Sequence, residues 1–478
     1  MLLNTFPFFV FFIIVYIAYW KIPKNIRWVF LLLASYYFFG SWKPAYLGLI
    51  FLTTIINYFL ALSIHTSVQY KKGFLILALL FDLGALLIFK YFNFFAYSVA
   101  QVFLLGHWTV HLPQFTLLVP IGISFYTFQT IGYLTDVYRG KIKPEKHFGY
   151  LALFLCFFPQ VSAGPIERAD ELLPQFKKIH EFNYLQAASG LKLFTFGLFK
   201  KMVIADNLAI IVDRVFNSLP TYKGLSLVIA VVLFSWQIYT DFSGYTDMSR
   251  GVARMLGFDL VPNFNLPYFA TSVRDFWRRW HMSLSRWFRD YIYLPLGGNR
   301  GSLVKTCVNV LIVFTLCGLW HGAAWTFVLW GVFHGFVMAG ERVVEKLSEN
   351  RLYVPNYLKV AYTYFMVSIS WIFFRANTLP DALYVFRYSM VGLKNIISPN
   401  YIWASLNQLF VRNKTEMIIT FGLLCIALLI DQISRTTPLS QRIRKQPVIV
   451  RYALYVLMLL MIVHLRNADI KAFIYTRF

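Results

Sequence analysis

A histidine at position 321 lies in the most apolar part of this chain and is its strongest candidate for chemistry. It stands in the run Trp320-His321-Gly322, and from residue 304 to residue 339 the only charged side chain is Lys305. Ionisable groups inside apolar membrane segments are rare and often mark a site or a relay. A neutral imidazole can take a proton from a hydroxyl or a thiol and return it to a leaving group. The residue alone leaves open whether His321 does this or only hydrogen-bonds a neighbouring helix.

A second histidine, His334, follows thirteen residues later in the same apolar stretch. For this residue a structural hydrogen-bonding role is the favoured interpretation, ahead of catalysis. Glycines at 318, 322, 331 and 335 surround the two histidines. Such small residues permit close approach of helices or of a substrate.

The segment from Phe264 to Arg300 combines another histidine with a basic face. Trp280-His281 precedes Leu284 and Trp287 at helical spacing, and arginines occupy the other faces. Arginine forks bind phosphate by charge-assisted hydrogen bonds, so this face could hold a phosphorylated carrier. The alternative is that the arginines pair with lipid phosphates and with Asp275 and Asp290. The arginines concerned are Arg278, Arg279, Arg286 and Arg289.

Two further apolar segments carry polar stripes. One runs from Pro120 to Gly140 and includes Asp136; the other runs from Gln237 to Gly251 and includes Asp241 and Asp247. Polar stripes on membrane helices line cavities or form hydrogen bonds between helices. For most of these residues, bonding between helices is the favoured interpretation.

The composition predicts that these candidates are positioned by membrane helices. Of the 478 residues, 58% are hydrophobic and 14% are charged, and the net charge is +24. Soluble domains average about 25% charged residues. The basic residues gather in short connections between apolar runs, as the positive-inside rule expects, so contact with anionic lipids is favoured over nucleic-acid binding. The four cysteines lack metal-type spacing and predict neither a zinc site nor a disulfide framework.

Apolar runs long enough to cross a bilayer recur about a dozen times. We expect one integral membrane domain over residues 1–478, with the N-terminus outside and 6–20 as a retained first span rather than a cleaved leader. Residues 148–161 are predicted to be re-entrant, 247–305 to lie on the cytoplasmic side with amphipathic helices, and 304–340 to form a hairpin carrying His321. The predicted spans are 5–20, 28–40, 45–64, 74–97, 116–136, 186–212, 224–246, 306–320, 323–340, 357–374, 416–434 and 448–466.

At these residues the chain resembles the membrane-bound O-acyltransferase family, and within it the bacterial branch that O-acetylates alginate, cellulose and peptidoglycan. The likeness is most specific at 264–300 and 318–335, and weaker at 124–140 and 160–168. The closing Phe473-Ile474-Tyr475 with Phe478 also resembles that branch. The D-alanine transferases of teichoic acids are shorter relatives of it.

The resemblance implies an all-α polytopic bundle of about 11–12 transmembrane helices, with re-entrant and amphipathic cytoplasmic helices around a central tunnel. His321 matches the family's catalytic histidine, and His281, 40 residues earlier, matches a second active-site position. The implied donor is cytoplasmic acetyl-coenzyme A, with no permanently bound cofactor. We expect Arg278, Arg279, Arg289 and Trp280 to contact the coenzyme. The implied partner is an extracytoplasmic acyltransferase of the SGNH-hydrolase type, at a bacterial cytoplasmic membrane.

Other functions stay open from the sequence. A lipid or protein acyltransferase would share the motifs but use another acyl donor. A proton-coupled transporter would also suit an intramembrane histidine, although no inverted repeat is visible. A scaffold that only recruits the partner enzyme would not need either histidine. No residue identifies the acceptor, so peptidoglycan, alginate and other exopolysaccharides all fit.

Overall fold

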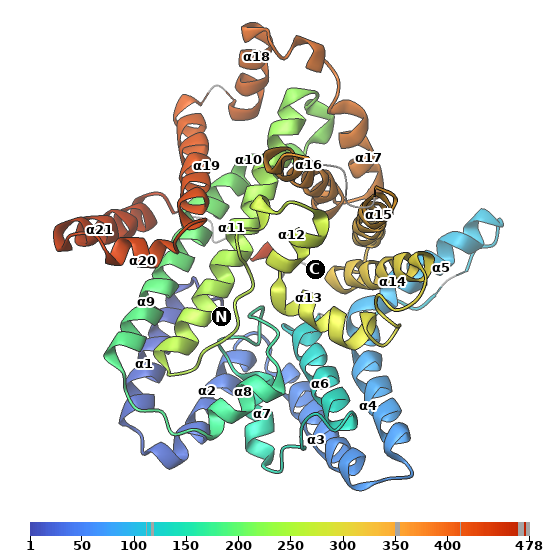
Figure 1. Ribbon diagram of the computed structural model, residues 1–478, viewed down its shortest axis with the longest axis vertical. Helices are drawn as coiled ribbons and strands as arrows, with labels where there is room; N and C mark the ends of the chain where they lie inside the picture. The colour runs from blue at the N-terminus through green and yellow to red at the C-terminus, as the bar shows by residue number, and fades with distance from the viewer. Residues whose placement is uncertain (111, 116–118, 349–353, 412, 467–472, 475–478) are drawn as a thin grey trace. The chain divides into compact units, whose positions relative to one another are not determined.

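The computed structural model describes the chain except residues 111, 116–118, 349–353, 412, 467–472 and 475–478 (Figure 1). Every regular element in the described part is helical, as the sequence predicts. The first half contains α1 (Phe6–Lys21), η1 (Lys24–Ile26), α2 (Arg27–Gly40), α3 (Ala45–Thr66), α4 (Lys71–Leu86), η2 (Leu87–Tyr91), α5 (Phe92–Leu105), α6 (Ile123–Tyr138), α7 (Phe148–Cys156), α8 (Ala169–Lys177), α9 (Tyr184–Leu198), η3 (Phe199–Ala205), α10 (Asp206–Phe216) and η4 (Leu219–Thr221).

The second half begins with the longest helix, α11, and carries both candidate active-site histidines. Its elements are α11 (Leu225–Met255), η5 (Pro267–Phe269), α12 (Val273–Arg279), α13 (Met282–Phe288), η6 (Arg289–Tyr293), α14 (Leu303–His321), α15 (Trp325–Leu347), α16 (Asn356–Arg375), α17 (Leu379–Tyr388), η7 (Leu393–Asn395), α18 (Pro399–Phe410), α19 (Lys414–Ser434), α20 (Leu439–Arg444) and α21 (Val448–His464).

The helices form two compact units, and the chain passes from one unit to the other several times. Unit 1 comprises residues 1–194, 248–262 and 286–292, and unit 2 comprises residues 195–247, 263–285 and 293–478. In unit 1, α6 is the central helix, because nearly all its side chains are buried and it packs against both α3 and α4 (Figure 1). Residues 151–169, which contain most of the predicted re-entrant run, are buried without exception.

Unit 2 is built around the α14–α15 hairpin, which covers the predicted 304–340 segment. Gly318 and Gly331 face each other where the two helices are closest. A Cβ on Gly318 would lie 2.3 Å from the carbonyl oxygen of Phe327, and one on Gly331 would lie 2.1 Å from that of Phe314. Only glycine permits this separation, so the small residues bring the backbones together as expected from the sequence.

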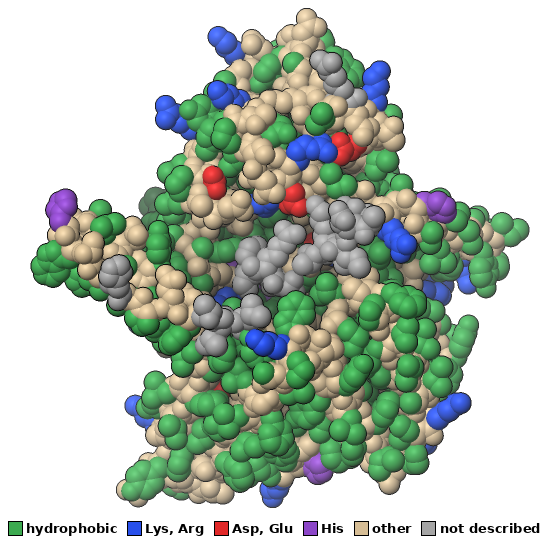
Figure 2. All heavy atoms as spheres, turned by 180° about the vertical axis from the view of Figure 1, so that it is seen from behind, with side chains coloured by type: hydrophobic (Ala, Val, Ile, Leu, Met, Phe, Trp, Pro, Cys, Tyr) green, Lys and Arg blue, Asp and Glu red, His purple; other side chains and the backbone are tan. Residues whose placement is uncertain are grey.

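Seven helical segments are long and apolar enough to cross a membrane, as judged from length and composition in the described part of the chain: α3, α4 with α5, α11, α14, α15, α16 and α19. The other predicted spans fall on α1, α2, α6, α21 and the interrupted α9–η3–α10, which are shorter helices. In the 116–136 run, the helix begins only at Ile123, and residues 116–118 lie outside the described part. Hydrophobic side chains cover broad areas of the surface, with Lys and Arg in scattered spots (Figure 2). The chain is a multi-pass membrane protein.

Candidate active site

His321 is the last residue of α14 and lies inside unit 2, with 3% of its surface exposed. Three aromatic side chains surround its ring. The ring centroids of Trp320, Trp330 and Phe374 lie 4.9, 4.8 and 5.5 Å from that of the imidazole. These residues come from α14, α15 and α16, so three apolar helices enclose the imidazole in a setting from which water is largely excluded.

His281 occupies the short connection between α12 and α13, with a left-handed backbone φ of 42°. A non-glycine residue in this region costs about 1–3 kcal/mol and persists only when its surroundings hold it. Here Asn263 supplies the restraint: its backbone oxygen accepts from Met282 N at 3.0 Å, and its side-chain oxygen accepts from Ser283 N at 3.1 Å. The fold therefore fixes His281 at a backbone conformation that sequence patterns do not predict.

The two histidines, 40 residues apart in sequence, lie close together in unit 2. Their ring centroids are 6.5 Å apart at an interplanar angle of 61°. The His281 ring also meets Phe242 edge-on at 4.7 Å and Trp320 at 5.9 Å. The structure thus places both predicted catalytic residues within one aromatic cluster, where both imidazoles could contact a single small group.

Burial determines the charge of His281. Its side chain is fully buried, and the loss of solvation lowers its pKa to about 3. The imidazole is therefore neutral at pH 7 and a weak proton acceptor. It remains able to donate or accept one hydrogen bond at each ring nitrogen according to its tautomer. This favours an orienting or polarising role for His281 over that of a general base.

His334 has the structural contact expected for it. Its Nδ1 accepts a hydrogen bond from Trp277 Nε1 at 3.3 Å, so the neutral ring carries its proton on Nε2. The ring packs against Trp277 and Trp330 at centroid distances of 5.2 and 5.0 Å. His334 thus holds α15 against α12 by an aromatic and hydrogen-bonded contact.

The four residues predicted to contact the coenzyme have different surroundings. Arg278 is exposed, and no ion pair joins it within the described residues. Arg279 is bound to Asp275 at 3.0 Å. Trp280 is completely buried, stacked on Phe276 at 5.4 Å, so its ring belongs to the core of unit 2. Arg289 belongs to unit 1, whereas both histidines belong to unit 2.

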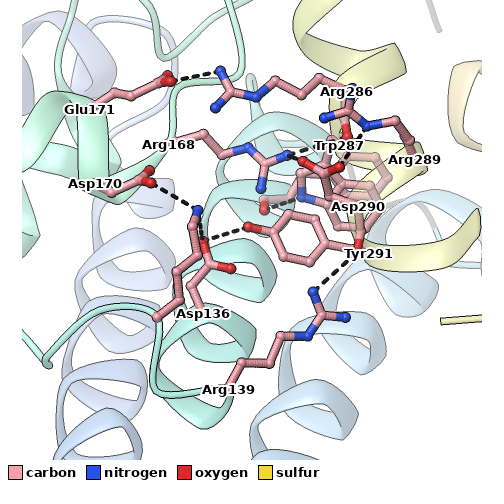
Figure 3. A network of polar contacts seen from close by, with 12 residues as sticks. Asp136, Arg139, Arg168, Asp170, Glu171, Arg286, Trp287, Arg289, Asp290 and Tyr291 are labelled. Carbon is pink, nitrogen blue, oxygen red and sulfur yellow. Dashed lines mark hydrogen bonds and ion pairs between the residues drawn. The ribbon is translucent and has the colours of Figure 1, made fainter. Parts of the chain in front are cut away.

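Arg289 is part of a polar network in unit 1 (Figure 3). Asp290 accepts from Arg289 and from the buried Arg168, both at 2.7 Å. The Arg168 guanidinium stacks over Tyr291 at 4.4 Å, and the Tyr291 hydroxyl donates to Asp136 at 2.8 Å. Sequence reasoning singled out Asp136 and Asp290 but missed Arg168. Nothing in the sequence around Arg168 indicates that its partner is Asp290.

Arg286 is neutralised in the same network, because its guanidinium pairs with Glu171 at 2.7 Å (Figure 3). For Arg279, Arg286 and Arg289, the structure therefore shows pairing with carboxylates, which was the alternative to phosphate binding. Asp275 and Asp290 are two of the partners, as that alternative proposed.

The second polar stripe forms a buried ion cluster in unit 2. Asp241 and Asp206 flank Lys201 at 2.7 and 2.8 Å, and all three side chains are buried. Asp241 also accepts from the backbone N–H of Ile474 at 2.9 Å. This bonding between helices is what the polar stripe predicts. The sequence analysis did not single out Lys201, which lies within the predicted span 186–212.

The C-terminal residues Phe473 and Ile474 lie close to the histidine pair. Phe473 stacks on Tyr245 at 4.5 Å and contacts Phe242 at 5.5 Å, and Phe242 in turn packs against His281. Tyr475 and Phe478, which carry the rest of the closing motif, lie outside the described residues. Among the described residues, no group of three His, Cys, Asp or Glu side chains is arranged to hold a metal ion.

Comparison with known proteins shows the family to which this chain belongs. Residues 146–376 match the model of MBOAT, the membrane-bound O-acyltransferase family, and these residues include both His281 and His321. The chain is 38% identical over 408 residues to a peptidoglycan O-acetyltransferase of Helicobacter pylori, which covers 79% of this chain and 76% of the relative. It therefore belongs to the membrane-bound O-acyltransferase family and is an O-acyltransferase.

Other relatives include a probable alginate O-acetylase and a teichoic acid D-alanyltransferase. It is 39% identical over 377 residues to a probable alginate O-acetylase, AlgI, of Azotobacter vinelandii, covering 76% of this chain and 72% of the relative. It is 28% identical over 263 residues to a teichoic acid D-alanyltransferase of Bacillus subtilis, covering 53% of this chain and 66% of the relative. The chain is thus related to the peptidoglycan and alginate O-acetyltransferases.

Proposed function

We propose that this protein moves an acetyl group from cytoplasmic acetyl-coenzyme A across the membrane, for O-acetylation of a cell-envelope polysaccharide. The observation that carries the proposal is the buried pair of His281 and His321, enclosed by aromatic side chains from apolar helices. The relatives named above, which act on peptidoglycan or alginate, supply the class of acceptor.

In this proposal His321 acts as the general base. Its neutral imidazole removes the proton from an acceptor hydroxyl, whose oxygen attacks the thioester carbonyl carbon. The tetrahedral intermediate then collapses with cleavage of the carbon–sulfur bond. The imidazolium returns the proton to the departing thiolate, so the products are an acetyl ester and coenzyme A as a thiol. General base catalysis of this kind contributes about 10²–10⁴-fold to a rate.

His281 has the complementary role of polarising the thioester. Because its pKa is lowered to about 3, it stays neutral and can donate a hydrogen bond to the carbonyl oxygen as negative charge develops there. The αL backbone held by Asn263 fixes the direction of that donor. A preorganised donor stabilises the transition state without reorganisation.

For the coenzyme phosphates, Arg278 is the best supported of the predicted contacts. It is exposed and free of an ion pair within the described residues, and it lies two residues before Trp280 and three before His281. Arg279 would first have to leave Asp275. We propose Arg278 as the primary phosphate contact of acetyl-coenzyme A.

We further propose that the acetyl group passes to an extracytoplasmic acyltransferase of the SGNH-hydrolase type, at a bacterial cytoplasmic membrane with the N-terminus outside. The charge pattern supports this orientation, since the connections at 21–27 and 71–72 are basic and the 101–115 connection has no Lys or Arg. Single cysteines placed at Gln101 and Lys24 in a cysteine-free background would test it. A membrane-impermeant maleimide should label the first in intact spheroplasts and the second only after lysis.

The proposal is tested by replacing His321 with alanine in cells that carry the partner genes. Ester-linked acetate would be released by mild alkali from purified peptidoglycan and from exopolysaccharide, and then quantified. Acetylation of one polymer should fall to the level of a gene deletion, while the protein remains in the membrane at wild-type amounts. Normal acetylation at normal protein levels would overturn the assignment and would favour the scaffold interpretation.

A further inference from the structure

A pocket in unit 1 is lined by basic and aromatic side chains. It lies where the α1–η1–α2 connection meets the end of α8, and its cavity volume is about 100 Å³. Its basic lining residues are Lys24, Arg27, Lys177, Lys178 and His180, and no aspartate or glutamate is among its lining residues. The pocket is therefore a positively charged recess on a membrane protein.

Neighbouring carboxylates neutralise only part of this charge. Lys24 pairs with the exposed Glu181, and Lys177 pairs with Glu145 at 2.5 Å. Arg27 and Lys178 form no ion pair within the described residues, although the Arg27 charge helps to lower the pKa of the exposed Glu181. An anion entering the pocket would meet these two cations without displacing a carboxylate from either.

Arg27 is held rigidly at its place in the lining. Its guanidinium donates to the backbone oxygens of Ile22, His180 and Trp20 at 3.0, 2.9 and 3.2 Å, and it stacks over Tyr19 and Trp20. Carbonyl acceptors fix the group without cancelling its charge. A preorganised cation of this kind loses little conformational entropy when it binds an anion.

The pKa of His180 is consistent with this excess of positive charge in the pocket. Burial lowers its pKa, and the neighbouring Lys178 and Arg27 charges lower it further. Its ring stays in contact with the backbone oxygen of Gln175 at 2.8 Å. A bound anion would offset the repulsion from Lys178 and Arg27.

The residues around the pocket are typical of the depth at which lipid headgroups are found. It adjoins the end of α1 and the start of α2, two apolar helices, and Trp20 and Trp28 stand at those ends. Tryptophan is enriched at the membrane–water interface. Along α1, exposed side chains such as Phe6, Ile13 and Ile17 form an apolar surface that could receive acyl chains.

We propose that this pocket binds the phosphate-bearing headgroup of an anionic phospholipid, with the acyl chains lying along the exposed face of α1. The phosphate oxygens would accept from Arg27 and Lys178, with Lys24 at the rim. The aromatic rings of Trp28 and Tyr150 line the pocket beside them. This proposal does not depend on the proposed function.

The test uses the purified full-length protein in detergent, with binding of phosphatidylglycerol and phosphatidylcholine followed by native mass spectrometry. The wild-type protein should retain phosphatidylglycerol in preference to phosphatidylcholine. Lys24→Gln with Lys178→Gln should weaken phosphatidylglycerol binding about 25-fold, since each lysine near the surface contributes about a fivefold factor. The matched control is Lys72→Gln with Lys143→Gln, which removes two exposed lysines of the same unit elsewhere and should leave binding unchanged.

Lys178→Gln alone, at an exposed site, should weaken binding about fivefold, and it serves if the double variant is unstable. Equal binding of the two lipids, or equal losses in the site and control variants, would overturn the proposal. Displacement of the lipid by an equimolar amount of inorganic phosphate would also overturn it, by showing that the pocket recognises free phosphate rather than a lipid. Retention of the lipid in that competition supports it.

Discussion

Two imidazoles share an aromatic enclosure in unit 2 but are held in different ways. His321 ends a regular helix, so its position follows from the packing of α14 against α15 and α16. His281 sits in a left-handed turn and depends on hydrogen bonds to the 263–265 loop. In the proposed mechanism, His321 accepts and returns a proton, whereas His281 is a hydrogen-bond donor held in a fixed direction.

The buried, neutral state of His281 predicts a pH-dependent stability. Its pKa is about 3 in the folded protein against 6.5 for an exposed histidine, so below pH 6.5 the unfolded chain binds a proton that the folded protein excludes. The free energy of unfolding is therefore highest above pH 6.5 and falls towards pH 3, by about 1.4 kcal/mol for each pH unit in that window. Denaturant titration in detergent at pH 7.5 and pH 5.5 would measure the fall.

The variant His281→Asn isolates this contribution, because every other titrating group is shared with the wild-type protein. Between the two pH values, the wild-type protein should lose about 1.4 kcal/mol more than the variant. Parallel losses in the two proteins would show that the His281 imidazole is not buried in its neutral form.

At the level of elements, the α14–α15 hairpin positions His321. Gly318 lies one helical turn before the histidine, at the point where the two backbones are closest. The residue types and spacing of this hairpin were readable from the sequence, because a long apolar run with small residues is a local pattern.

Gly318→Ala should therefore damage both stability and activity. Its Cβ would lie 2.3 Å from the Phe327 carbonyl oxygen, so the helices must separate, at a cost of about 1–3 kcal/mol. The matched control is Gly340→Ala on α15, where a Cβ meets nothing within 4 Å. That variant should be neutral or slightly stabilising, since alanine favours a helix. Equal thermal stability of the two variants would contradict the close approach.

The network around Asp290 ties the 286–292 segment to the rest of unit 1 (Figure 3). Asp290→Asn would leave the buried Arg168 without its carboxylate, which should destabilise the protein by about 3–5 kcal/mol. Glu345→Gln removes the exposed pair with Arg274 and should cost at most about 1 kcal/mol. Thermal unfolding would measure both changes, and a loss for Asp290→Asn no larger than for Glu345→Gln would show that the network contributes little.

The sequence predicted the helices more completely than it predicted the surroundings of the two histidines. Within the described residues, each of the twelve predicted spans falls largely on helix, because apolar length and polar interruptions are local signals. The aromatic residues around His321 from α15 and α16, and the restraint of His281 by Asn263, depend on contacts between distant segments. The burial of Trp280 depends on such contacts as well. Trp280, which we expected to contact the coenzyme, lies in the core of unit 2.

On the scale of the whole molecule, the chain passes repeatedly between two units, and residues 248–262 and 286–292 join the first. No hydropathy pattern marks these exchanges, since they follow from tertiary packing. Membership of the membrane-bound O-acyltransferase family accounts for the multi-pass helical architecture. The proposed transfer across the membrane belongs to this scale, because it depends on the orientation of the whole chain and on the proposed partner.

The central claim is that His321 carries out acyl transfer from acetyl-coenzyme A. The most direct measurement follows release of radiolabelled acetyl from acetyl-coenzyme A by the purified protein in detergent, with palmitoyl-coenzyme A as a second donor. The wild-type protein should consume acetyl-coenzyme A in preference, and His321→Asn should slow the reaction by about 10²–10⁴-fold while the unfolding temperature stays near that of the wild type. Undiminished turnover by a folded His321→Asn protein would contradict the account.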